Sequence, residues 1–278
     1  MDEEKKGNMS NLLARVLTAA VAAPVVVWLT WIGGLPFTLL ILVAVGISLY
    51  EFLAMVEKSS PVCIGIVWIL GVSLAWGSTT TWFLHHAWMV LVLGVMVILL
   101  AYLFFPGSVV RGSAERAALS MLAVLYAAGL PACLIHLRML KDGWAWVLLA
   151  MIITWGSDTA AYFSGRAFGK RKLYPLISPK KTWEGAFGGL LGSMLFSFVA
   201  WLTFFPRISI IHLLIISLLG GAVGQMGDLV ESMIKRSVGV KDSGKLLPGH
   251  GGLLDRIDAL IFAAPILLFY ATYILEWH

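Results

Sequence analysis

Long apolar runs, separated by short polar segments, dominate the chain. Nine of them approach or exceed the length of about 20 residues that a helix needs to cross the hydrocarbon core of a membrane. They cover 12–33, 36–56, 61–77, 87–105, 117–137, 143–164, 183–205, 208–234 and 253–275. The run 61–77 is short for a span, and 117–137 is also compatible with an inner helix. The pattern predicts an all-α polytopic integral membrane protein with about nine transmembrane helices.

Composition agrees with this interpretation. The 278 residues are 60% hydrophobic and only 13% charged, with a mean hydropathy of +0.91, which excludes an ordinary soluble domain. The two cysteines, Cys63 and Cys133, lie in apolar surroundings, so no disulfide framework or thiolate metal site is expected. The start, MDEEKKGNMSN, is too acidic for a typical signal peptide, and we expect the first apolar run to be retained.

The basic residues predict an orientation. If nine helices alternate in direction, 17 of the 20 lysines and arginines fall on the side of the N-terminus, and only Arg138, Lys141 and Arg207 fall on the other. Cytoplasmic loops carry such an excess of positive charge. The N-terminus and the loops 165–182 and 235–252 are therefore predicted to face the cytoplasm.

Three apolar runs carry carboxylates where a membrane disfavours them. The sixth ends in SDTAAYF, which places Asp158 and Tyr162 one helical turn apart. The eighth ends in GDLVESMIK, which forms one polar stripe, and the ninth begins with DRID, which puts two aspartates on one face. The stripe consists of Asp228, Glu231, Ser232 and Lys235, and the two aspartates are Asp255 and Asp258. Because all three groups lie at predicted cytoplasmic helix ends, we expect them to converge on one cavity open to water.

Structural roles remain open for the same residues. The stripe on the eighth run is also compatible with ion pairs at a helix end, and Asp255 and Asp258 with stabilisation of a positive helix N-terminus. In SPKKTWEG, Lys180 and Lys181 are also suited to binding anionic lipid head groups.

The residue types favour phosphate chemistry. Aspartate oxygens are hard ligands for Mg²⁺, which is commonly shared with substrate phosphates, and neighbouring lysines and arginines neutralise phosphate oxygens. Glycine-rich backbone, as in KDSGKLLPGHGG, can approach a polyphosphate closely. No Walker-type, HExxH, GxSxG or Rossmann motif is present in the sequence. These features together predict a membrane-embedded, metal-dependent enzyme that acts on phosphate-bearing substrates.

A long motif resembles a known family. From Ser232 to Asp258 the chain reads SMIKRSVGVKDSGKLLPGHGGLLDRID. These 27 residues resemble the signature of the phosphatidate cytidylyltransferases, also called CDP-diacylglycerol synthases, without departure at any specified position. SDTAAYFSGR and SPKKTWEG are similar to the family as well, so the resemblance covers roughly the C-terminal half.

The resemblance implies a reaction and its surroundings. Cytidylyl is transferred from CTP to phosphatidic acid, with divalent metal, to give CDP-diacylglycerol and pyrophosphate. It implies a membrane-embedded helical enzyme, a homodimer, in the cell (inner) membrane with its active site facing the cytoplasm, and no nucleic-acid partner. We expect N-terminal transmembrane helices in 1–140 and the catalytic region in 141–278.

The resemblance also assigns roles to residues. Asp228 and Asp255 would hold Mg²⁺, Asp258 would be a ligand or orient one, and a second cation is left open. The remaining candidates are basic or polar: Lys235, Arg236, Lys241 and Arg256 for phosphates, Ser232 for a phosphate or the metal, His250 for CTP or for bracing its loop, and Lys180 and Lys181 for either substrate. The individual roles of Asp158, Glu184 and Glu231 stay open.

Two other functions fit parts of the pattern. Carboxylates inside a membrane also mark the ion pathways of transporters and channels. Against transport, the polar groups cluster at one side instead of the midplane, and no internal repeat is evident. A lipid kinase that uses a nucleoside triphosphate is the nearer alternative.

Overall fold

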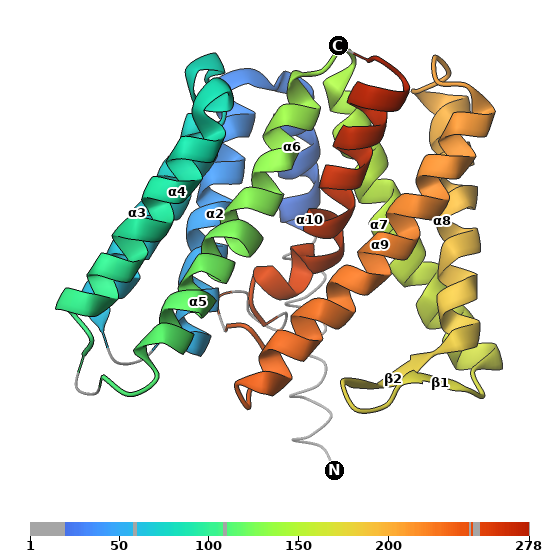
Figure 1. Cartoon of the computed structure of the whole chain (residues 1–278). Coiled ribbons are helices and arrows are strands. Elements are labelled where there is room, and N and C mark those ends of the chain that lie inside the picture. Colours follow the sequence, from blue (N-terminus) through green and yellow to red (C-terminus); the bar gives the residue numbers. More distant parts are fainter. Residues whose placement is uncertain (1–19, 58–59, 108–109, 245, 247–250, 278) are drawn as a thin grey trace. The chain divides into compact units, whose positions relative to one another are not determined.

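A computed structural model of the chain describes residues 20–57, 60–107, 110–244, 246 and 251–277 (Figure 1). Most of these residues are helical. The helices are Ala20–Ile32, α2 (Gly34–Val56), α3 (Pro61–Gly77), α4 (Thr81–Phe104), α5 (Ser113–Ala123), the π-helix η1 (Val124–Gly129), α6 (Leu130–Met139), α7 (Gly143–Phe168), α8 (Trp183–Thr203), α9 (Ile210–Ser237), α10 (Leu254–Phe269) and the π-helix η2 (Tyr270–Ile274). Two short strands, β1 (Lys172–Tyr174) and β2 (Ser178–Thr182), complete the fold.

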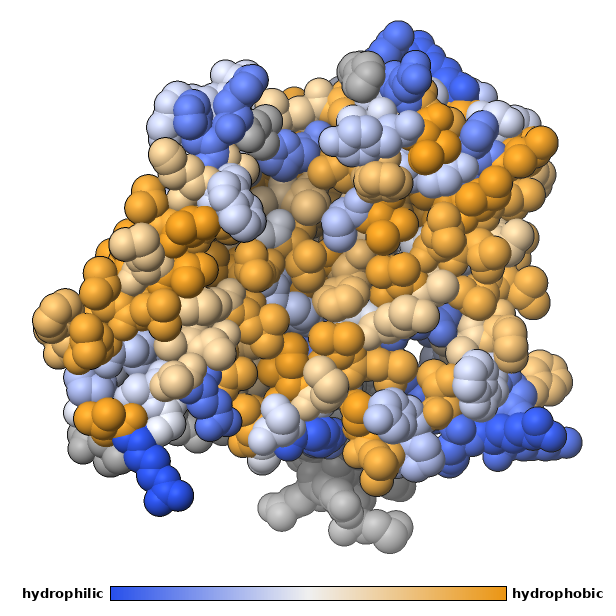
Figure 2. Space-filling view, in the orientation of Figure 1, coloured by the Kyte–Doolittle hydropathy of each residue, from blue (hydrophilic) through white to orange (hydrophobic). Residues whose placement is uncertain are grey.

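Seven helical segments within the described residues are long and apolar enough to cross a membrane. They confirm the prediction of an all-α polytopic membrane protein. The helices Ala20–Ile32 and Pro61–Gly77 are apolar but shorter, and the first predicted span, 12–33, begins outside the described residues. The count of nine and the cytoplasmic N-terminus therefore stay predictions. In Figure 2, hydrophobic residues cover much of the visible helix surface, as a lipid-facing surface requires.

The chain divides into two compact units. The first unit comprises Met1–Ile135 and Asp242–Arg256, and the second comprises His136–Lys241 and Ile257–His278. The division falls within α10, after its first turn. The segment 242–256 thus packs with helices that precede it by more than 100 residues.

A buried polar network supports the interior of the first unit. Glu57, at the end of α2, accepts hydrogen bonds from the Tyr102 hydroxyl (2.6 Å) and from the backbone N–H of Ser60 (3.2 Å). The Arg116 guanidinium lies 3.3 Å from the same carboxylate. Because a buried carboxylate is tolerated only when it is paired, this network fixes the ends of α2, α4 and α5.

Small residues bring α7 and α8 of the second unit close together. A Cβ atom added at Gly188 would overlap with the Ser164 side chain, and one added at Gly192 would overlap with Ala160. Helices in membranes pack through such small residues, which let their backbones approach. The close packing holds the ends of both helices in a fixed relation.

A β-hairpin joins α7 to α8, where the sequence predicted only a loop. β1 pairs antiparallel with β2, and Trp183 N–H donates to the Arg171 carbonyl at 2.9 Å. Thr182 caps α8 by accepting the Gly185 N–H at 3.1 Å. The hairpin presents the basic residues of β2 beside the ends of α7 and α8 (Figure 1).

Candidate functional site

A cavity in the second unit brings together polar residues of α7, β2 and α9. Its volume is about 420 Å³. The charged and hydrogen-bonding residues that line it are Asp158, Tyr162, Arg166, Lys180, Lys181, Thr182, Gln225 and Asp228. Asp158 and Tyr162 thus share a face, as their spacing predicted, and Asp158 and Asp228 open into one cavity.

Asp228 lies at the centre of the contacts in this cavity. The Lys181 ammonium lies 2.7 Å from one of its carboxylate oxygens, and the Ser232 hydroxyl lies 3.5 Å from the other. Both charged side chains are partly exposed, at 26% for Lys181 and 33% for Asp228. The ion pair is therefore open to an incoming charged group, and neither side chain is locked in the interior.

Glu184 holds the hairpin that carries Lys180 and Lys181. Its carboxylate accepts the backbone N–H groups of Lys170, at 3.1 Å, and of Arg171, at 3.2 Å. Glu184 also lies in the first turn of α8, where a negative charge interacts favourably with the helix dipole. A structural reason for Glu184, whose role the sequence left open, is thus to position the basic strand.

Gln225 ties the three helices of the cavity together. Its amide nitrogen lies 3.1 Å from the Ser157 hydroxyl on α7 and 3.1 Å from the Ala186 carbonyl on α8. Gln225 is one helical turn from Asp228, so these bonds hold the part of α9 that carries the aspartate.

Asp258 belongs to the same unit and the same group of charges. A Cβ atom at Gly227 would lie 2.7 Å from the Asp258 carbonyl, so α9 and α10 approach closely at this level. The Asp258 carboxylate is near enough to Asp228, Asp158 and Lys235 for their charges to interact. Its Oδ1 atom also accepts the Ala259 N–H at 2.7 Å. Three carboxylates of the second unit, from α7, α9 and α10, are therefore electrostatic neighbours.

The remaining polar residues of α9 have different surroundings. Lys235 forms a buried ion pair with Glu231, which is 2% exposed. Arg236 is exposed, and its guanidinium donates to the Val240 carbonyl at 3.1 Å beyond the end of the helix. Lys241 is exposed. The predicted polar stripe exists, but its buried half is an ion pair.

Asp255 lies in the first unit, where backbone N–H groups hold it. Its carboxylate accepts the N–H of Ser243 at 3.0 Å and the N–H of Gly252 at 2.9 Å. Gly251 has a φ of +83°, a left-handed conformation that favours glycine at this point of the loop. Arg256, the next residue, is exposed, and His250 lies outside the described residues.

Glu51 is a buried carboxylate that the sequence analysis missed. It is 3% exposed on α2, and it accepts N–H groups from Leu253 (3.0 Å) and Leu254 (2.9 Å) and contacts the Ser243 hydroxyl at 3.4 Å. Glu51 therefore satisfies the N-terminal N–H groups of α10 and braces the loop that holds Asp255. The available signal was a single glutamate inside the predicted span 36–56.

The donor atoms fit a magnesium ion only in part. Among the residues that the structure describes, no group of three or more His, Cys, Asp or Glu side chains is arranged to hold a metal. Mg²⁺ is commonly bound by one or two carboxylates together with water and substrate phosphates, so a complete protein cage is not required. The Lys181 ammonium beside Asp228 already places one positive charge on this carboxylate. The donor set suits a hard cation that arrives with phosphate.

Comparisons with known proteins agree with one another. A model of the cytidylyltransferase family matches residues 13–274. The chain is 35% identical to a phosphatidate cytidylyltransferase of Bacillus subtilis, over 94% of this chain and 98% of the relative. It is 37% identical to one of Brucella suis, over 96% of each chain. A phosphatidate cytidylyltransferase of Staphylococcus epidermidis is 49% identical over 46% of this chain and 49% of its own length.

Proposed function

The chain belongs to the cytidylyltransferase family, and we propose that it transfers the cytidylyl group of CTP to phosphatidic acid, giving CDP-diacylglycerol and pyrophosphate. The observation that carries the proposal is the similarity, over nearly the whole chain, to relatives named phosphatidate cytidylyltransferase. The cavity of the second unit supports it, because carboxylates and lysines face each other there as nucleotidyl transfer requires.

The reaction exchanges one bond to phosphorus for another. A phosphate oxygen of phosphatidic acid attacks the α-phosphorus of CTP, and the bond from this phosphorus to the bridging oxygen of the β-phosphate breaks. The bonding electrons leave with pyrophosphate. Because the attacking phosphate is already ionised near neutral pH, no strong general base is needed, and positioning dominates.

Asp228 and Asp255 are the proposed ligands of Mg²⁺, and Asp258 is a further ligand or orients one. When bound, the cation offsets negative charge on the phosphates of CTP. Gln225 holds the turn of α9 that carries Asp228, and the N–H groups of Ser243 and Gly252 hold the Asp255 carboxylate. A second cation remains part of the proposal.

The basic residues neutralise the phosphates of the two substrates. We assign Lys181 and Lys180 on β2 to this role, because Lys181 can exchange Asp228 for a phosphate oxygen without leaving the cavity. The exposed Arg236, Lys241 and Arg256 are suited to phosphates that arrive from water. Ser232 and Lys235 are the candidates on α9. The Ser232 hydroxyl lies beside Asp228, and Lys235 forms a buried ion pair with Glu231. His250 remains a candidate for CTP.

The proposal includes an assembly and a place in the cell. The enzyme is an integral membrane protein with its active site on the cytoplasmic side, where CTP is available, and it forms a homodimer. The phosphate of a phospholipid lies at the membrane surface, so polar residues at helix ends are where the two substrates can meet.

Purified protein incubated with phosphatidic acid and CTP tests the proposal. The label of CTP carrying ³²P at the α-phosphate should appear in the lipid, and label at the γ-phosphate should appear only in pyrophosphate. Transfer of the γ-label to lipid would identify a lipid kinase instead. No transfer of either label, with ion flux in reconstituted vesicles, would favour a transporter.

A further inference from the structure

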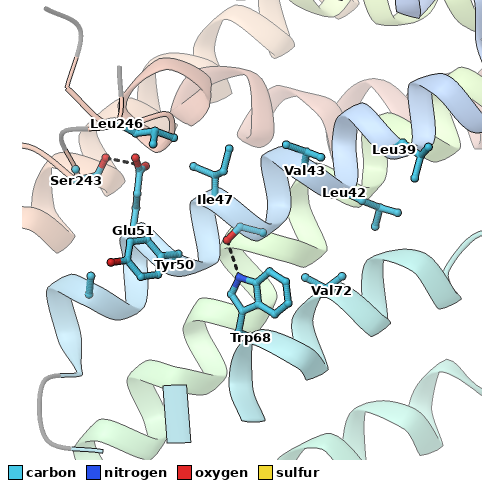
Figure 3. A pocket seen from close by; sticks show the side chains of 13 residues that line it. Leu39, Leu42, Val43, Ile47, Tyr50, Glu51, Trp68, Val72, Ser243 and Leu246 are labelled. Atoms are coloured by element: carbon cyan, nitrogen blue, oxygen red, sulfur yellow. Dashed lines mark hydrogen bonds between the residues drawn. The ribbon is translucent and has the colours of Figure 1, made fainter. Parts of the chain in front are cut away.

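A second, larger cavity runs along α2 in the first unit. Its volume is about 780 Å³. Figure 3 shows the side chains that line it. Its long wall is one face of α2, formed by residues at a spacing of three and four, and it is completed by α3 and by Ser243, Gly244 and Leu246. The α2 residues include Leu39, Leu42, Val43, Gly46, Ile47 and Tyr50. We call this cavity the α2 groove.

The α2 groove is apolar along most of its length and polar at one end. Leu39, Leu42 and Val72 line one end, and Tyr50, Glu51 and Ser243 lie together at the other (Figure 3). The α2 residues that line it extend from Leu39 to Ala54, a rise of about 22 Å along the helix. One leaflet of a bilayer contributes about 15 Å of hydrocarbon, so the groove is long enough for the part of an acyl chain that lies within one leaflet.

A tryptophan fixes the wall of the groove between α2 and α3. The Trp68 indole N–H donates to the Gly46 carbonyl at 2.8 Å. A Cβ atom at Gly46 would lie 3.1 Å from the Trp68 ring, so the absence of a side chain at Gly46 lets the ring lie against α2. The wall of the groove between α2 and α3 is therefore part of the packing of the first unit.

The polar end of the groove is formed by the loop that holds Asp255. Ser243 and Gly244 line the groove, and the N–H of Ser243 donates to the Asp255 carboxylate. Glu51 lines the same end, but its oxygens accept N–H groups of Leu253 and Leu254 and are not left to repel an incoming lipid. The apolar groove thus ends at Ser243, which is hydrogen-bonded to the proposed metal ligand Asp255.

We propose that the α2 groove binds an acyl chain of the phosphatidic acid that is the substrate, with the glycerol end of the lipid at Ser243 and Tyr50. The inference rests on the proposed function and adds to it the binding site for the apolar part of the lipid. A volume of 780 Å³ lies within the range of about 300–1,000 Å³ typical of small-molecule pockets, whereas a second copy of the chain requires an extended complementary face.

Photo-crosslinking tests where the acyl chain lies. Phosphatidic acid with a diazirine at mid-chain is added to the full-length protein in mixed micelles, irradiated, and the labelled peptides are identified by mass spectrometry. We expect label on Leu39–Ala54 and around Trp68, with competition by unlabelled phosphatidic acid and little by phosphatidylcholine. Equal competition by both lipids would mean that the groove holds any membrane lipid, and absence of label from Leu39–Ala54 in protein that is labelled elsewhere would mean that the acyl chain does not enter the groove. Either result overturns the inference.

Filling the groove gives a second, independent test. Val43 lines the groove and is 60% exposed, whereas Val97, on α4, is 41% exposed and does not line it. Val43→Trp should lower kcat/KM for dioleoyl phosphatidic acid about tenfold or more. The kcat/KM for dihexanoyl phosphatidic acid and the KM for CTP should stay nearly unchanged. Val97→Trp should leave kcat/KM unchanged for both the dioleoyl and the dihexanoyl substrate.

The outcomes separate the inference from the proposed function. An active wild type whose Val43→Trp variant loses long and short substrates equally, or loses neither, overturns the acyl-chain site and leaves the cytidylyltransferase proposal standing. A wild type that transfers no label to any phosphatidic acid overturns the proposed function, and with it the assignment of the groove to a substrate.

Discussion

Glu51 on α2 accepts a hydrogen bond from the backbone N–H of Leu254, the first residue of α10, at 2.9 Å. The two residues are 203 positions apart in the sequence. The same carboxylate accepts the Leu253 N–H, so a buried charge of one helix neutralises the N-terminus of another. Through Ser243, this contact also braces the loop that holds Asp255.

Removing the Glu51 carboxylate should lower both the stability and the activity of the protein. Glu51→Ala leaves buried N–H groups without an acceptor, so we expect the free energy of unfolding to fall by about 2–4 kcal/mol. Thermal unfolding in detergent measures the change. Glu115→Ala, at an exposed position in the first turn of α5, is the matched control and should lower stability by no more than about 1 kcal/mol, the size of its interaction with the helix dipole. Equal stability of the two variants would refute the bracing role.

The ion pair between Lys181 and Asp228 predicts a substrate effect. Lys181→Met removes a charge from the cavity, and we expect kcat/KM to fall by about 10- to 100-fold, mainly through a higher KM for CTP or for phosphatidic acid. Lys172→Met, at an exposed position of β1, removes the same charge outside the cavity. If both variants behave alike in steady-state assays, Lys181 does not contact a substrate.

Alanine substitution should have opposite effects at two helical glycines, one in the contact of α7 with α8 and one outside it. Gly192→Ala places a methyl group where Ala160 already lies, so the free energy of unfolding should fall by about 1–3 kcal/mol. Gly94→Ala on α4 meets nothing within 4 Å and should raise it by up to about 1 kcal/mol through helix propensity. Thermal unfolding of both variants in one detergent compares them. A stability change of the same sign and size at both positions would contradict the close packing.

The distribution of basic residues predicts which side each end of the second unit faces. A cysteine at Ser178, on β2, should react with an impermeant thiol reagent only from the cytoplasmic side, in a background without Cys63 and Cys133. A cysteine at Arg207, which pairs with Asp142 at 2.8 Å, should react only from the opposite side. Labelling of Ser178→Cys in intact cells would contradict the orientation.

Helix positions could be predicted well from the sequence, because each span is one long apolar run. The predicted span 143–164 corresponds to Gly143–Phe168, and 208–234 to Ile210–Ser237. The hairpin was missed because SPKKT has no alternating apolar pattern, and the hairpin is held by Glu184 from α8. The conformation of the hairpin therefore depends on hydrogen bonds to a residue outside it, which the local sequence does not reveal.

Residues of the site could be predicted by type, but many of their partners could not. The spacing of Asp158 and Tyr162 placed them on one face, and both line the cavity. The partners of Asp228 on β2 and of Glu51 on α10 come from distant segments, and single-sequence periodicity contains no information about such contacts. Glu51 had a signal in its charge alone, whereas Gln225 had none.

The transfer of α-³²P from CTP to phosphatidic acid by two aspartate variants tests the central claim most directly. In reconstituted protein with a titration of Mg²⁺, Asp228→Asn and Asp255→Asn should each lower turnover by orders of magnitude, since each removes a charge that attracts the cation. Asp142→Asn is the matched control, because Asp142 pairs with Arg207, does not line the cavity, and has a φ of 52° that asparagine tolerates. Of the three variants, the account predicts near-normal activity only for Asp142→Asn. Near-normal turnover of Asp228→Asn or Asp255→Asn, with an unchanged dependence on Mg²⁺, would contradict it.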